Sequence, residues 1–592
     1  MFNRILRVNL TDQTTQKGKI PDAVLRDFIG GKGVGLWLLT QEDMSNDPFD
    51  PGNPLIFVTG PLTGSLIQTS GRSALVTRSP LTNTFLDSHA GGHFGPALRR
   101  TGNDYLLIKG ASETPVYLHV TSDGAEFKPA EDLWGKDAFE TEKTLWKQYP
   151  KAKVACIGQA GENLVRFAAI GTELFRHFGR GGAGAVMGSK KLKAVVVEGD
   201  IQPVMADPEE HRRLAVKLTD DLKEHPNAQK RKELGTMMWV RMGHEEGGFL
   251  PTKNFQYGQF EHYENLTAET MKEQLKWTSK GCYGCGVIMC SKVSHWDGKE
   301  MEGPEYETTA YLGSGCMLDD AEDVAEANWL CDQYGLDTIS TGVTISYAME
   351  SAEKKTLNPE DNEWIQWGSA EAVHRLIKKI AYREGIGDTL AEGTRRASKT
   401  IGGDSGYWAI QIAGMELSGV NPLGSYSMAL ALTTSDFASH TRLWTATSEM
   451  HNQLNIEELP ETIVSGQDEI NARNSLIVCD FLPYGFDRIM PFLNAATGWE
   501  YTGEDLMTAG ARMQTLSRLY NLDKGRSIED DTLPERFFNE ESVSGLMKGK
   551  RIPRDLFKRH VEEIYGIRGW DKNGVPLPET IERLGLEPHM LL

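Results

Sequence analysis

The run Lys193-Ala-Val-Val-Val197 and the segment Pro208-Glu-Glu-His-Arg-Arg-Leu-Ala-Val-Lys-Leu218 decide the fold class of this chain. The first is a short apolar run rich in β-branched residues, which is typical of a buried strand. The second begins with proline and acidic residues and spaces its apolar residues at helical intervals, which predicts a helix. The chain therefore changes from strand to helix near residue 205.

Upstream of this change, short β-like runs alternate with glycine-bearing turns. They begin at Phe2 to Arg7 and include Leu55-Ile-Phe-Val-Thr59, Ser73-Ala-Leu-Val-Thr77 and Tyr105-Leu-Leu-Ile-Lys109. Downstream of residue 206 the pattern stays mostly helical to the end. The prediction is an α+β protein with a sheet-rich domain over residues 1–205, and the length of 592 residues predicts about three domains.

Composition restricts the class of protein. Hydrophobic residues make up 39% and charged residues 25%, as in a folded globular chain. The 83 acidic against 63 basic residues give a net charge of −20, which argues against binding nucleic acid or an anionic membrane. The sequence shows no signal peptide and no apolar run long enough to span a bilayer. We therefore expect a cytoplasmic protein with reduced cysteines.

Three of the seven cysteines stand in one stretch, Cys282-Tyr-Gly-Cys285-Gly-Val-Ile-Met-Cys290. Gly281, Gly284 and Gly286 let this backbone bend so that the sulfurs can converge. A fourth ligand must come from elsewhere. The spacing fits a [4Fe–4S] cluster or a four-thiolate zinc site equally well, and the remaining alternative is three thiols that pack as small apolar groups.

Five further motifs, in this order along the chain, carry a resemblance to the aldehyde ferredoxin oxidoreductase family. They are Gly71-Arg72-Ser73 with Ser79-Pro80-Leu81-Thr82, Ala90-Gly-Gly-His-Phe-Gly-Pro96, Phe178-Gly-Arg-Gly-Gly-Ala-Gly-Ala-Val-Met-Gly-Ser-Lys-Lys-Leu-Lys-Ala194, Gly303-Pro-Glu-Tyr-Glu307 and Asp332-Gln-Tyr-Gly-Leu-Asp337. With Asn474-Ser-Leu-Ile-Val-Cys479 they extend the resemblance over nearly the whole chain.

The resemblance implies an N-terminal double β-sheet domain that forms the base for a tungsten bis-pterin cofactor, followed by two largely helical domains. Residues 206–411 would carry the cysteine stretch and the first pterin motif, and residues 412–592 the second pterin motif. It also implies a [4Fe–4S] cluster held by Cys282, Cys285, Cys290 and Cys479. Cys156, Cys316 and Cys331 are then core thiols, although Cys316 lies close to the metal in the family.

The first pterin motif also has a local structural interpretation. Residues 318–334 read as a helix that ends at Gly335, and Asp337 is placed to cap a second helix over residues 338–351. Phosphates favour helix N-termini and glycine-rich turns. The resemblance adds that Asp332, Leu336 and Asp337 contact the pterin, which is compatible with capping.

The resemblance implies further cofactor contacts elsewhere in the chain. They are Arg72, His89, Gly91, Arg180, Gly181, Gly182, Arg442, Asn474 and Val478, with an Mg²⁺ ion bridging the pterin phosphates. Two of these depart from the family pattern, because His89 stands where Asn is usual and Asn474 where Asp is usual. The four residues between Cys285 and Cys290, where archaeal aldehyde oxidoreductases have three, indicate a divergent branch.

Glu307 and His440 are the predicted catalytic residues, because the family places a Glu and a His beside the metal-bound oxygen. The predicted reaction is the oxidation of an aldehyde to a carboxylic acid. Electrons would pass to ferredoxin or a small iron–sulfur subunit, with a flavin subunit as a further partner, in an oligomer or larger complex.

Two alternatives remain open from the sequence. The chain could be the tungsten subunit of an aromatic acyl-CoA ring reductase, which has the same cofactors but reduces its substrate instead of oxidising it. It could also be a non-catalytic electron-transfer scaffold that keeps only the iron–sulfur cluster.

Overall fold

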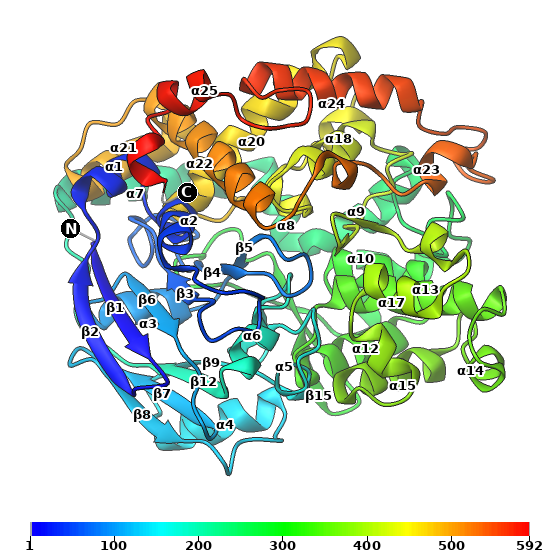
Figure 1. The fold of residues 1–592 in the computed structure, drawn as a ribbon, viewed down its shortest axis with the longest axis horizontal. Coiled ribbons are helices and arrows are strands. Elements are labelled where there is room, and N and C mark those ends of the chain that lie inside the picture. The colour runs from blue at the N-terminus through cyan, green and yellow to red at the C-terminus, as the bar shows by residue number, and fades with distance from the viewer. Residues whose placement is uncertain (1–2, 591–592) are drawn as a thin grey trace.

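The computed structural model describes residues 3–590 and begins with two six-stranded sheets (Figure 1). The first sheet has the order β2-β1-β6-β3-β4-β5 and the second β11-β10-β9-β12-β7-β8. The strands of the first are β1 (Arg4–Asn9), β2 (Thr14–Lys19), β3 (Leu55–Val58), β4 (Ser73–Arg78), β5 (Phe85–Ala90) and β6 (Tyr105–Lys109). Those of the second are β7 (Val116–Val120), β8 (Ala125–Pro129), β9 (Lys153–Cys156), β10 (Ile170–Thr172), β11 (Arg176–Phe178) and β12 (Leu192–Val197).

Most neighbouring strands are antiparallel, while β1 pairs with β6 and β7 with β12 in parallel. Strands β3, β4 and β12 are buried at every residue, so both of their faces are covered by protein. This explains their continuous apolar runs. The double sheet confirms the predicted N-terminal fold, and the predicted strands are present over the part of the chain that the structure describes, which excludes Phe2.

Helices from distant parts of the sequence cover the first sheet (Figure 1). Helix α2 (Gly31–Glu42) packs on β3 and β4, and α20 (Leu459–Leu476) packs on both α2 and α22 (Gly503–Asp523). At Gly35 a Cβ atom would lie 2.6 Å from Val76, so only glycine allows α2 to approach the sheet this closely. The C-terminal part of the chain is therefore anchored directly on the N-terminal sheet.

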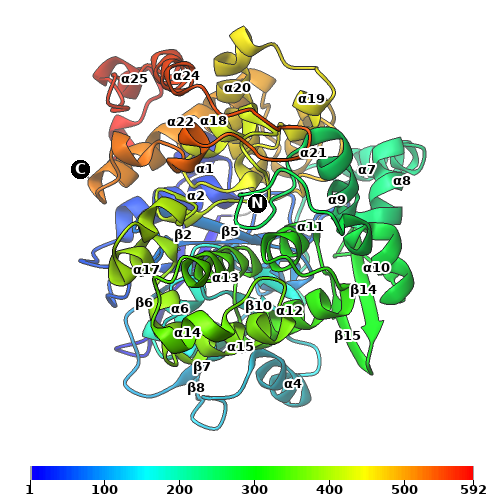
Figure 2. The same cartoon turned by 90° about the vertical axis from the view of Figure 1, so that its right-hand side faces the viewer.

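The rest of the chain is largely helical, as predicted (Figure 2). Helix α7 spans Pro208–Lys223, α12 Ala321–Tyr334 and α13 Thr338–Glu353. Gly335 ends α12 in the left-handed region with φ of 75°, and the Asp337 carboxylate accepts hydrogen bonds from the backbone N–H groups of Ile339 and Ser340 at 3.2 Å. Both helix boundaries near the first pterin motif are confirmed.

A small sheet interrupts the helical part and carries the cysteine loop, residues 282–290. Its strands are β13 (Thr278–Lys280), β14 (Ser291–Trp296) and β15 (Lys299–Glu302), and the loop joins β13 to β14. The division into two helical domains near residue 411 stays a prediction. None of the helices within residues 3–590 combines the length and the apolar character that crossing a bilayer requires.

Candidate functional site

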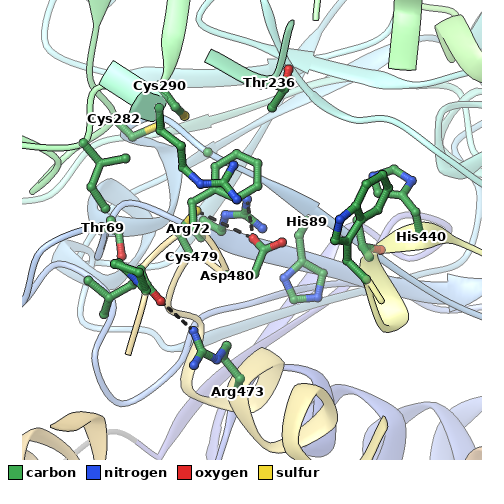
Figure 3. A pocket seen from close by; sticks show the side chains of 18 of the residues that line it. Thr69, Arg72, His89, Thr236, Cys282, Cys290, His440, Arg473, Cys479 and Asp480 are labelled. Carbon is green, nitrogen blue, oxygen red and sulfur yellow. Dashed lines mark hydrogen bonds and ion pairs between the residues drawn. The ribbon is translucent and has the colours of Figure 1, made fainter. Parts of the chain in front are cut away.

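A cavity of about 760 Å³ lies where the double-sheet domain meets the helical part of the chain (Figure 3). Its walls come from the ends of β4 and β5, from β11, from the cysteine loop, and from segments near residues 305, 440 and 480. The predicted site residues that line it are Arg72, His89, Gly91, Cys282, Cys285, Cys290, Glu307, His440 and Cys479. Folding therefore gathers both the predicted cluster ligands and the predicted catalytic pair around one space.

The four thiols form one end of the cavity, which we call the thiol end together with Arg72 and Asp480. Cys479 follows α20, far along the chain from the cysteine loop, and lines the same cavity as the three cysteines of that loop. All four are free thiols and none is fully exposed. Within residues 3–590 no three His, Cys, Asp or Glu side chains are arranged to hold a single metal ion.

Burial and a fixed cation act in opposite directions on the charge of the sulfurs at the thiol end. Burial raises the pKa of the Cys479 thiol to about 12, so this thiol keeps its proton unless a metal replaces it. Burial also works against the charge of Arg72, but Cys479, Asp480 and Cys282 around its guanidinium raise its pKa overall. Arg72 forms an ion pair with Asp480 at 3.0 Å. A cation is thus fixed beside the thiols.

Glycines hold the cysteine loop against the double-sheet domain. A Cβ atom at Gly91 would lie 2.8 Å from the Cys282 sulfur, and one at Gly71 would lie 2.9 Å from the backbone of Tyr283. The Tyr283 N–H donates to the Gly92 carbonyl at 3.2 Å, and the Thr69 N–H donates to the Gly284 carbonyl at 2.8 Å. The backbone contact fixes the loop without intervening side chains.

Glu307 and His440 form an acid–base pair at another part of the wall. Glu307 Oε1 lies 3.3 Å from His440 Nδ1, and the Gly419 N–H donates to Glu307 Oε2 at 2.8 Å. The His440 N–H donates to Ser418 Oγ at 3.1 Å. The Tyr306 hydroxyl donates to the Gly419 carbonyl at 2.6 Å, which secures the segment that holds both residues. In Figure 3 His440 lies across the view from Cys282 and Cys290.

Arg180 lies behind this pair, outside the cavity wall. Its guanidinium donates to Ser418 Oγ at 2.9 Å and to the Glu416 carbonyl at 2.5 Å, and it lies 3.4 Å from an Asp337 oxygen. Ser418 therefore connects Arg180 to His440. Gly181 and Gly182 adopt φ of 84° and 86°, and a Cβ at Gly182 would lie 2.0 Å from the Arg166 carbonyl, so this turn requires glycine.

The other first-pterin residues lie near the cavity but behind its lining. Asp332 accepts a hydrogen bond from Asn328 at 3.0 Å and lies 3.6 Å from the ring of His177, which does line the cavity. Burial, with the neighbouring Arg176, lowers the pKa of His177 to about 4, so the ring is neutral near pH 7. Burial raises the pKa of Asp332 well above its usual range. Leu336 is buried beside them.

Arg442 lies beneath His89 in a buried ion network. Its guanidinium pairs with Asp87 at 2.5 Å and Asp436 at 3.0 Å, and the Lys32 ammonium lies 2.5 Å from Asp436. Asp87 also contacts the His89 ring at 2.9 Å. Arg442 therefore holds Asp87 in place, and Asp87 in turn orients the His89 ring. Asn474, in the last turn of α20, and Val478 are buried and do not line the cavity.

Several cavity residues were missed from the sequence. They are Arg176, His177, Arg231, Trp239, Glu305, Trp444, Arg473, Asp480 and Phe481. Glu305 stands inside the quoted Gly303 to Glu307 motif, and Asp480 directly follows Cys479, so their positions gave a signal. The others come from separate elements and carry no local pattern.

Comparisons with known proteins identify the relatives of this chain. The family model for the N-terminal domain of aldehyde ferredoxin oxidoreductase matches residues 5–199, and the model for its domains 2 and 3 matches residues 213–586. The chain is 35% identical to the tungsten-containing aldehyde ferredoxin oxidoreductase of Pyrococcus furiosus and 36% identical to that of Pyrococcus abyssi, with 99% of each chain covered. An aliphatic sulfonate oxidoreductase, WOR-like subunit, of P. furiosus is 32% identical over 98% of this chain and 96% of its own.

A solved structure gives a further likeness. The active site complex BamBC of benzoyl coenzyme A reductase, in complex with 1,5-dienoyl-CoA, superposes with a TM-score of 0.86 at 25% identity, covering 99% of this chain and 97% of that one. The similarities in sequence and fold thus extend from end to end. The chain belongs to the aldehyde ferredoxin oxidoreductase family.

Proposed function

We propose that this protein is a tungsten-pterin and [4Fe–4S] oxidoreductase that oxidises an aldehyde to a carboxylic acid and passes electrons to a ferredoxin or ferredoxin-like subunit. The observation that carries the proposal is the common cavity, which has four thiols and the Glu307–His440 pair on its walls. The family relatives named as tungsten-containing aldehyde oxidoreductases cover the whole chain and support it.

The residues present fit the implied cofactors. Cys282, Cys285, Cys290 and Cys479 would hold the cluster, and Arg72 would offset the charge of their thiolates. The absence of a side chain at Gly91 lets the Cys282 sulfur lie directly against the backbone at the cavity wall. When bound, the tungsten cofactor supplies two-electron chemistry and the cluster supplies a one-electron exit.

Arg72, His89 and Gly91 line the cavity, which supports their proposed contacts with the pterin. Arg180, Asp337 and Arg442 would act from behind that wall, because their charges are already paired with protein groups. A bridging Mg²⁺ ion belongs to the same proposal.

Aldehyde oxidation combines an aldehyde with water and releases a carboxylic acid, two electrons and two protons. Glu307 Oε1, at 3.3 Å from His440 Nδ1, is placed to exchange a proton with the imidazole. The Gly419 N–H holds the other carboxylate oxygen, so the carboxylate keeps its orientation toward His440. His440 Nε2 can then donate a hydrogen bond to the carbonyl oxygen of the aldehyde and polarise it.

The second candidate is the reduction of an aromatic acyl-CoA ring, with obligatory partner subunits. The likeness to the BamBC complex favours it, because that complex binds a dienoyl-CoA. Purified protein containing both metals would be assayed with benzaldehyde and oxidised viologen, and separately with benzoyl-CoA and reduced viologen. Turnover of benzaldehyde supports the first proposal. Turnover of benzoyl-CoA alone would replace it with the second.

The third candidate, an electron-transfer scaffold, is tested by metal analysis. About four iron atoms per chain without tungsten would support the scaffold, whereas tungsten together with iron supports an enzyme. The Glu307–His440 pair on the cavity wall favours the enzyme, because a scaffold needs no proton-transfer groups.

A further inference from the structure

Three aromatic side chains form a continuous surface along the cavity, which we call the aromatic wall: Trp239, Trp444 and Phe481. The ring centroids of Trp239 and Trp444 are 4.8 Å apart, and those of Trp239 and Phe481 are 6.4 Å apart. Trp444 lies edge to face with the His440 ring at 6.3 Å. The wall therefore leads from Phe481 to the acid–base pair.

Arg231, on helix α8 (Pro226–Leu234), stacks on this wall. Its guanidinium carbon lies 4.0 Å from the centroid of Phe481 and 5.0 Å from that of Trp239. Within residues 3–590 its guanidinium makes no hydrogen bond and no ion pair, and its Nη1 atom is buried without a partner. Burial lowers the pKa of Arg231, although Asp480 and Cys479 lie near enough to favour its charge.

The other arginines on the cavity wall have partners. Arg72 pairs with Asp480 at 3.0 Å, and Arg176 pairs with Glu302 at 2.7 Å. Arg473 donates to the Leu482 carbonyl at 3.0 Å and so secures the loop after Cys479. Arg231 differs from these three because its guanidinium has no hydrogen-bond or ion-pair partner in the part of the chain that the structure describes.

The geometry of a guanidinium indicates what Arg231 can bind. Stacking on aromatic rings uses its faces and leaves the N–H groups in the plane of the group free to donate. A buried donor without an acceptor costs free energy, so an acceptor from a bound molecule is favoured there. A carboxylate matches two parallel N–H groups in one plane.

Apolar side chains extend the lining of the cavity beyond the aromatic wall. They are Leu443, Ile470, Pro483 and Tyr484, and a Cβ at Gly466 would lie 2.7 Å from Leu443, so α20 packs closely there. Flat, apolar molecules are favoured by these contacts.

We propose that Arg231, Trp239 and Phe481 form a subsite for aromatic substrates that carry a carboxylate at the end opposite the aldehyde. The ring lies on the aromatic wall, the carboxylate binds the free edge of Arg231, and the aldehyde points to His440. This inference rests on the proposed function for the identity of the reacting group. The subsite itself depends only on ligand binding.

The test is calorimetric binding to the protein with its metals. Benzoate and its neutral analogue benzyl alcohol are the probes, and the variants are Arg231→Met, Arg231→Lys and, as an exposed control, Arg212→Met. The expected result is benzoate binding about 10–100-fold weaker in Arg231→Met, the range for one charged hydrogen-bonding contact, with benzyl alcohol unchanged. Arg231→Lys keeps the charge and should lose less. Arg212→Met should bind both probes as the wild type does.

Turnover gives the second readout. In Arg231→Met the KM for 4-formylbenzoate should rise by a similar factor, while the KM for benzaldehyde stays near its wild-type value. Equal weakening of benzoate and benzyl alcohol would overturn the subsite, as would a wild-type protein that does not bind benzoate. Loss of tungsten or iron from Arg231→Met would also overturn it, by assigning Arg231 to a resident cofactor. Arg231-dependent benzoate binding without any aldehyde oxidation would uphold the subsite and refute the proposed function.

Discussion

The thiol end and the aromatic wall border the same cavity but are built differently. At the thiol end the cation Arg72 is paired with Asp480, and the backbone packs directly on backbone at Gly71 and on the Cys282 sulfur at Gly91. Along the aromatic wall the side chains are large and apolar, and among residues 3–590 Arg231 stacks on two of them without a hydrogen bond or an ion pair. Paired charges and close backbone packing suit a group that stays in place. Open donors beside apolar rings suit molecules that enter and leave.

Removing a thiol should have the largest effect on the bound cofactors. If it did not, the thiol end would not be the place where a resident group is held. Cys479→Ala is expected to lower bound iron from about four atoms per chain and to abolish electron transfer, because the cluster would lose one of its four proposed ligands. Cys156→Ala is the matched control, since Cys156 is buried in β9 away from the cavity. Iron analysis and electron paramagnetic resonance measure the outcome. Equal iron in both variants would remove Cys479 from the site.

Changes at the acid–base pair should leave the thiol end intact. Glu307→Gln and His440→Asn are each expected to retain tungsten and iron and to lose about 10²–10⁴-fold in kcat, the usual cost of removing one acid or base. Gln keeps an acceptor for the Gly419 N–H, so the fold of the segment should persist. Near-normal turnover with full metal content would make the pair structural.

A methyl group added at the thiol end tests its close packing. Gly91→Ala would place Cβ 2.8 Å from the Cys282 sulfur, so the cysteine loop must shift and stability should fall by about 1–3 kcal/mol, with reduced iron. Gly286→Ala, in the same loop, is the control because nothing lies within 4 Å of its Cβ position. Thermal unfolding and iron content would be compared. Similar losses in both variants would contradict a specific contact at Gly91.

A smaller, pH-dependent effect is expected beside Gly92. Burial works against the charge of Glu173, but ion pairs with His93 at 3.0 Å and Lys153 at 3.1 Å outweigh it and lower its pKa to about 2. Between pH 2 and 4.5 the unfolded chain therefore binds more protons at this residue than the folded one, so stability rises with pH over that window.

The free energy of unfolding of the wild type should thus exceed that of Glu173→Gln by about 1–3 kcal/mol above pH 4.5. This difference in stability should narrow as the pH falls toward 2. Denaturation curves at pH 7 and pH 4 measure the gap, with the exposed Glu131→Gln as control. A gap that is constant across this range would show that the ion pairs of Glu173 do not stabilise the fold.

Local features of the sequence predicted much of this molecule. The strand runs, the end of α12 at Gly335 and the capping of α13 by Asp337 depend on neighbouring residues, and all were recovered. The cysteine spacing located the thiol end. The roles of Arg180 and Arg442 were less accessible, because their partners Glu416, Asp87 and Asp436 are distant in the chain. Arg231 and the aromatic wall had no local signal, since the residues that make the wall come from three separate segments.

The place of Cys479 in the chain has a consequence for biosynthesis. The cysteine loop is complete once Cys290 has been made, but Cys479, its proposed fourth partner, lies beyond α20. At a synthesis rate of roughly 5–20 residues per second, the nascent chain carries three of the four thiols for roughly 10–40 seconds before the last one leaves the ribosome. A cluster that uses all four thiols can therefore form only after Cys479 has been made, when about four fifths of the chain already exists.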